Sequence, residues 1–61
     1  MTINALVFRS FEPEDRKTPW MPVAEIYGSW VVLSEGCSTR KAALAWLDRW
    51  AAQRGIELSI G

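Results

Sequence analysis

The sequence contains no histidine and only one cysteine among its 61 residues. Histidine titrates closest to neutral pH and is the commonest metal ligand in proteins, so its absence removes most catalytic triads and zinc sites. Cys37 has neither a second cysteine for a disulfide nor a histidine to activate it as a nucleophile. We therefore expect no enzymatic activity, no metal and no cofactor, and we interpret Cys37 as a small packing residue.

The chain also lacks a long apolar run and an excess of charge of either sign. No stretch approaches the roughly 20 apolar residues of a membrane span, and Met1–Asn4 lacks the basic start of a secretory signal. A lone cysteine fits a reducing compartment, so we expect a cytoplasmic protein without a membrane partner. Seven basic residues balance seven acidic ones, which argues against nonspecific nucleic-acid binding and makes any electrostatic recognition local.

What is present is enough for one small domain over residues 1–61, whose stability must come from packing. Thr2–Phe11 has apolar residues on both alternating faces and is predicted to be a well-covered strand. Glu12–Pro19 is charged and bounded by prolines, so it is predicted to be a loop. A tight turn at Gly28-Ser29 is predicted to join two further β-rich segments into a hairpin.

The two strands of that hairpin are Trp20–Tyr27 and Trp30–Ser34. Pro22 removes a backbone donor from the first of them, which favours an edge position or a bulge at that point.

The helical pattern of Ser38–Arg54 is the strongest local signal. Leu44, Leu47 and Ala51 form the centre of an apolar sector, so this face should pack on a sheet. Ser38 or Thr39 caps the start, and Gly55 ends the helix in a left-handed conformation. Ile56–Ile60 alternates as a last strand.

These elements predict an α+β fold, a small β-β-β-α-β domain with one helix packed on one face of a three- to four-stranded sheet. A right-handed crossover returns the last strand beside the first, in the order 3-2-1-4. One helix leaves the other face of the sheet uncovered, and its apolar side chains favour use as an interface.

The layout from VAEIYGSWVVL through EGCSTRKAALAWL resembles small antitoxin domains with a partial ribonuclease-H-like fold, although Glu35-Gly36-Cys37 stands where that family has a Pro-Gly-Cys turn. This resemblance implies an antitoxin-like partner protein. The compact layout, the charged loop and the missing catalytic site are also similar to small anti-CRISPR inhibitors of phages and mobile elements. That second resemblance implies steric occupation of a protein target such as a CRISPR effector subunit.

The candidate partner-binding residues lie in the charged loop and on the hairpin: Glu12, Glu14, Asp15, Arg16, Lys17, Trp20, Tyr27 and Trp30. Tryptophan is enriched at binding hot spots, and loop charges set orientation and association rate. Because Trp20 follows the loop directly, we predict that it forms a contiguous patch with Glu14, Asp15 and Arg16. The alternatives are an ordinary solvated loop and aromatic residues that only stabilise the sheet.

Two further sets of residues leave the function open. Trp46 and Trp50, one helical turn apart, either edge the core or anchor an interface. Arg40, Lys41 and Arg49, combined with the aromatic hairpin, would suit single-stranded nucleic acid. We predict a non-enzymatic protein-binding module that acts as an inhibitor or regulator by steric occupation. The alternatives are a small nucleic-acid-binding domain or an antitoxin-like partner, and the surplus aromatic surface leaves a homodimer open.

Overall fold

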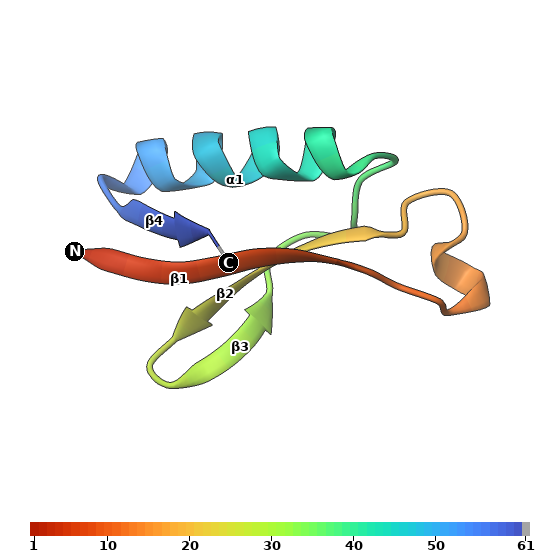
Figure 1. Ribbon diagram of the computed structural model, residues 1–61, viewed down its shortest axis with the longest axis horizontal. Helices are drawn as coiled ribbons and strands as arrows, with labels where there is room; N and C mark the ends of the chain where they lie inside the picture. The colour runs from red at the N-terminus through yellow and green to blue at the C-terminus, as the bar shows by residue number, and fades with distance from the viewer. Residues whose placement is uncertain (61) are drawn as a thin grey trace.

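In the computed structural model, which describes residues 1–60, four strands form one mixed sheet and one α-helix packs on one of its faces (Figure 1). The strand order is β3-β2-β1-β4, with β1 antiparallel to β2 and parallel to β4. This confirms the predicted β-β-β-α-β fold and its 3-2-1-4 order. The elements are β1 (Thr2–Arg9), the 3-10 helix η1 (Pro13–Asp15), β2 (Trp20–Ile26), β3 (Ser29–Val32), α1 (Arg40–Arg54) and β4 (Glu57–Ile60).

The core lies between α1 and the middle of the sheet. Ala43, Leu47 and Ala51 are buried at intervals of four residues, so they form one inward stripe of the helix. Leu47 packs against Ala5 of β1 and Ala24 of β2, which face each other across the two strands. Partly buried apolar residues surround this centre: Ile3, Val7, Ile26, Leu33, Trp46, Trp50 and Leu58.

The predicted buried face of the helix is confirmed at Leu47 and Ala51 but not at Leu44. Leu47 and Ala51 are buried as expected, whereas Leu44 is only partly buried. Ala43 takes the inward position instead, because it lies one helical turn before Leu47 and so on the same stripe.

Both ends of α1 follow the predicted capping chemistry. Thr39 has an extended backbone and its Oγ1 accepts a hydrogen bond from the Ala42 N–H at 3.0 Å, so the helix begins at Arg40. Gly55 has φ of 64° and its N–H bonds to the carbonyls of Ala51 and Ala52. A left-handed residue at this point ends the helix and directs the chain into β4.

The hairpin between β2 and β3 turns one residue earlier than predicted. Tyr27 and Gly28 are the central residues, with φ of 51° and 82°, which is the turn type with two left-handed positions. In this register Val23 faces Val32, whereas a turn at Gly28-Ser29 would place Val23 opposite Ser34. The observed turn therefore matches apolar side chains across the strands, even though Tyr27 adopts an unfavourable backbone conformation.

Pro22 lies in β2, which is an interior strand and not an edge strand. The second predicted arrangement, a bulge, is the one observed, and it lies in the segment that follows β3. The carbonyl of Pro22 accepts the Leu33 N–H at 2.9 Å, and the carbonyl of Trp20 accepts the Cys37 N–H at 2.7 Å. The two acceptors, Pro22 and Trp20, are separated by one residue of β2. The two donors, Leu33 and Cys37, are separated by residues 34–36, so the segment after β3 bulges outward. The missing N–H of Pro22 faces this bulge, where β3 has already ended.

The first strand is shorter than predicted. β1 ends at Arg9, and Phe11, the last residue of the predicted strand, lies outside it and is 87% exposed. The Ser10 N–H donates to the Pro19 carbonyl at 2.7 Å and closes the base of the predicted charged loop. This loop forms one end of the molecule (Figure 1).

Candidate protein-binding surface

Within residues 1–60, no helix or second sheet covers the sheet face opposite α1 (Figure 1). Residues that face each other in the register share a side of the sheet, and neighbours along a strand alternate sides. Ala5 and Ala24 face α1, so the residues next to them project the other way. We call this side the open face; its apolar members are Leu6, Phe8, Met21, Val23, Trp30 and Val32.

The open face leaves large apolar side chains in contact with solvent. Trp30 is 51% exposed, Val32 53% and Phe8 41%, whereas Met21 and Val23 on the same face are buried. Large apolar side chains exposed together on one face are typical of an interaction site.

The charged strand side chains that project from this face are both acidic. Glu25 faces Trp30 across β2 and β3, and its Oε1 accepts a hydrogen bond from the Asn4 amide at 3.4 Å. Glu57 is in register with Thr2 and so lies on the same side of the sheet. Arg9 is the only basic residue within the described strands, and its register with Trp20 puts it on the α1 side.

The charged loop meets the open face at one end. Phe8, Met21 and Val32 line an open hollow of about 540 Å³ together with Arg9, Ser10, Phe11, Glu12 and Asp15. An apolar floor therefore lies beside two carboxylates, with Arg9 at its border. The structure thus joins part of the predicted loop to a surface of apolar strand residues.

Hydrogen bonds hold this part of the loop in place. The Ser10 hydroxyl donates to Asp15 Oδ2 at 2.6 Å and accepts the Glu12 N–H at 3.3 Å. The Thr18 N–H donates to the Asp15 carbonyl at 3.1 Å. Asp15 is therefore partly buried and supports the loop, whereas the Glu12 side chain is exposed beside the hollow.

Trp20 lies on the other side of the sheet from the open face. It is partly buried, its backbone bridges Cys37, and the Arg9 guanidinium carbon is 6.0 Å from its ring centroid. Arg16 lines a different hollow with Phe11 and Pro19. Glu14 and Lys17 are exposed on the loop. The residues predicted as one patch are thus divided between two sides of the molecule.

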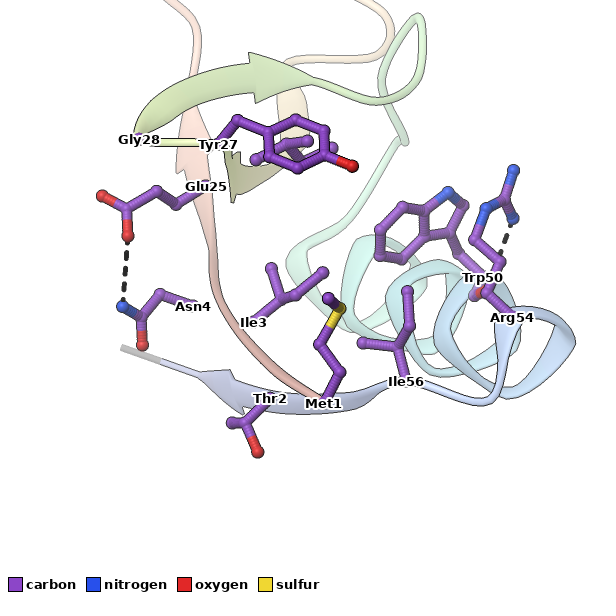
Figure 2. A pocket seen from close by; sticks show the side chains of 11 residues that line it. Met1, Thr2, Ile3, Asn4, Glu25, Tyr27, Gly28, Trp50, Arg54 and Ile56 are labelled. Carbon is purple, nitrogen blue, oxygen red and sulfur yellow. Dashed lines mark hydrogen bonds between the residues drawn. The ribbon is translucent and has the colours of Figure 1, made fainter.

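Tyr27 and Trp30 also separate, although both belong to the hairpin. Tyr27 is fully exposed and lines a groove of about 440 Å³ on the α1 side. Figure 2 shows Tyr27 and Trp50 beside this groove, with Met1, Ile3 and Ile56 along the side away from Tyr27. Trp30 instead belongs to the open face.

The two helix tryptophans edge the core, and one of them also lines the groove. Trp46 and Trp50 are partly buried and pack against the core cluster. The Arg54 guanidinium carbon lies 4.9 Å from the Trp50 ring centroid, within the range of a cation–π contact, and its Nη1 donates to the Trp50 carbonyl at 3.5 Å (Figure 2). Arg49 lies beside both tryptophans in a small hollow.

Sequence reasoning missed Phe8, Met21 and Val32 as surface residues of one site. The signal was present in Thr2–Arg9, where Leu6 and Phe8 alternate with the core-facing positions. What the pattern could not supply was the register that sets Phe8 opposite Met21 and beside the loop.

Two further observations concern sites of other kinds. Within residues 1–60 no three His, Cys, Asp or Glu side chains come close enough together to hold a metal ion. Helix α1, the one α-helix in the described part of the chain, is neither long nor apolar enough to cross a membrane.

Comparison of the chain with protein families, with curated proteins and with solved structures found no match in any of the three.

Proposed function

We propose that this chain is a non-enzymatic protein-binding module that acts as an inhibitor or regulator by covering a partner surface with its open face. The observation that carries this proposal is the exposure of Phe8, Trp30 and Val32 on a sheet face over which no helix packs. A contiguous apolar surface of this kind on a small domain is typical of an interaction site. Trp30 has the size and the partial burial of an interface anchor.

The charges around the open face define the chemistry of the partner. Glu12 and Asp15 lie at one end, and Glu25 and Glu57 lie on the strands. These carboxylates would repel phosphate groups and attract lysine and arginine. The complementary partner is therefore a protein surface with an apolar centre and a basic rim.

The resemblance to small anti-CRISPR inhibitors makes a CRISPR effector subunit one partner to test directly. Such complexes carry basic surfaces because they hold nucleic acid, and an acidic inhibitor surface would compete for them. An antitoxin-like role would use the same open face against a toxin. Both roles place the protein in the cytoplasm, which the single unpaired Cys37 suits.

Two exposed aromatic residues on different parts of the molecule provide a matched test of this surface. Phe8 belongs to the open face, whereas Tyr27 is fully exposed at the hairpin turn and lines the separate groove. Phe8→Ser and Tyr27→Ser both replace an aromatic ring by a small hydroxyl side chain. We expect Phe8→Ser to weaken partner binding by about 2 kcal/mol, the lower limit of a hot spot, and Tyr27→Ser to leave it within about 0.5 kcal/mol.

The measurement is quantitative capture from bacterial lysate, and from purified CRISPR effector complex, with the parent and both variants. Circular dichroism must show that each variant remains folded. A partner whose capture falls with Phe8→Ser and persists with Tyr27→Ser supports the proposal. If every captured protein responds equally to the two variants, the open face is not the binding surface.

The groove at the hairpin turn supports nucleic acid as a second candidate. Tyr27 and Trp50 offer aromatic surfaces there, and Arg54 supplies a cation beside Trp50. Stacking on aromatic rings with nearby arginine is the chemistry of single-strand binding. Titration of a labelled oligonucleotide at several salt concentrations separates the candidates, because phosphate-driven binding weakens steeply with salt. Tyr27→Ser should abolish such binding and leave Phe8-dependent capture unchanged.

A further inference from the structure

The free edge of β3 carries no protection against pairing with another strand. All four residues of Ser29–Val32 are exposed, and none is charged or a proline. Helix α1 contacts β1, β2 and β4 but does not reach β3. The opposite edge of the sheet differs, because β4 begins with the charged residue Glu57. Charge is a common device that keeps sheet edges from pairing, so β3 is the edge open to a new strand.

The hydrogen bonds to β2 determine which backbone groups of β3 point outward. The Leu33 N–H donates to the Pro22 carbonyl at 2.9 Å, so Leu33 directs its backbone groups toward β2. In an antiparallel ladder successive residues alternate sides. Val31 therefore also points toward β2, while Trp30 and Val32 direct their N–H and carbonyl groups away from the sheet.

We propose that a second copy of this chain pairs with β3 in antiparallel orientation, about a two-fold axis at Val31. Trp30 of each copy then lies opposite Val32 of the other, and each such pair exchanges two backbone hydrogen bonds. The two four-stranded sheets become one continuous sheet of eight strands. The N–H and carbonyl groups of Trp30 and Val32 on both copies are satisfied by this single register.

In this register the side chains of β3 pack favourably against the β3 side chains of the second copy. On the open face the indole of Trp30 meets Val32 of the second copy, an aromatic and β-branched pair of the kind that stabilises sheets. On the other face Val31, which is 41% exposed, meets Val31 of the second copy. No like charges oppose each other at this register, because β3 has none, and the chain has no net charge to repel its copy.

This pairing does not depend on the proposed protein-binding role. It occupies an edge of the sheet and leaves Phe8 and Glu12 uncovered, while Val32, at the border of their hollow, contacts Trp30 of the second copy. Two open faces would then lie side by side on one sheet, so a dimer would present the proposed binding surface twice.

The test is the concentration dependence of mass by sedimentation or light scattering, from micromolar to millimolar chain. We expect the parent chain to dimerise within this range. Val32→Pro removes an outward N–H and leaves the bonds to β2 intact, since an edge strand tolerates proline where its N–H faces outward. It should weaken dimerisation by about 10- to 100-fold, because each dimer loses two of its four intermolecular hydrogen bonds.

Hydrogen exchange identifies the edge that is used. The amides of Trp30 and Val32 should exchange slowly in the parent dimer, and the Trp30 amide should exchange rapidly in Val32→Pro. If Val32→Pro does not fold, chemical synthesis of the chain with an N-methyl group on the Val32 amide removes the same donor. The matched control is Phe8→Lys, which alters the open face away from the edge and should leave dimerisation unchanged.

Three results would overturn the proposal. The first is a parent chain that stays monomeric at millimolar concentration. The second is a dimer that survives Val32→Pro but is lost with Phe8→Lys, because the open faces would then be stacked. The third is protection of the Trp30 and Val32 amides only on addition of another protein, which would assign the edge to a different partner.

Discussion

Replacement of Leu47 by alanine tests the packing on which the whole fold depends. Leu47 is the largest non-proline side chain that is fully buried, and it lies between Ala5 and Ala24 on the sheet. The helix positions four residues before and after it are also alanines, Ala43 and Ala51. Alanine has no side-chain rotamers, so these neighbours cannot turn inward to fill the space that Leu47→Ala leaves.

The magnitude follows from the four alanines of the helix and the sheet that lie nearest to Leu47. Leu→Ala substitutions in cores cost about 2–5 kcal/mol, and the cost rises with the volume of the cavity that remains. We therefore expect Leu47→Ala to cost about 3–5 kcal/mol. Domains are stable by about 0.05–0.15 kcal/mol per residue, or roughly 3–9 kcal/mol for a chain of this length. Leu47→Ala should therefore remove between about one third and all of the free energy of unfolding.

The assay is urea unfolding followed by far-ultraviolet circular dichroism at one fixed protein concentration. Leu44→Ala is the matched control, since Leu44 lies in the same helix but is only partly buried, and we expect it to cost about 1 kcal/mol. A Leu47→Ala chain within about 1 kcal/mol of the parent would refute the assigned helix face. So would a Leu44→Ala chain that is the less stable of the two.

Three residues with positive φ give further predictions. Gly36 has φ of 112°, and a Cβ there would overlap the Thr18 carbonyl, so Gly36→Ala should cost at least about 2 kcal/mol in chemical unfolding. Gly28→Ala, which meets no atom within 4 Å, should cost less, and equal losses would contradict the close approach. Tyr27→Asn should raise stability by about 0.5–1 kcal/mol, because asparagine tolerates the left-handed turn position; a loss of stability would show that the tyrosine ring contributes to packing.

The sequence alone determined the elements whose signals are local. Thr39 and Gly55 mark the ends of α1 through hydrogen bonds to the backbone within a few residues, so no distant contact is needed to place them. The order of the strands also followed, since a right-handed crossover leaves few topologies for three strands, a helix and a strand. The uncovered sheet face was predicted for the same reason, because one helix covers one face.

Tertiary structure decided the register and therefore the surface. A turn at Tyr27-Gly28 or at Gly28-Ser29 is locally possible, and the match of Val23 with Val32 across the strands selects the first. That register, together with the pairing of Phe8 with Met21, brings Val32 to the hollow beside Glu12. Trp20, adjacent to the loop in sequence, points to the other side because neighbouring strand residues alternate faces. Local chemistry thus places the elements, while contacts between distant strands determine which side chains share a surface.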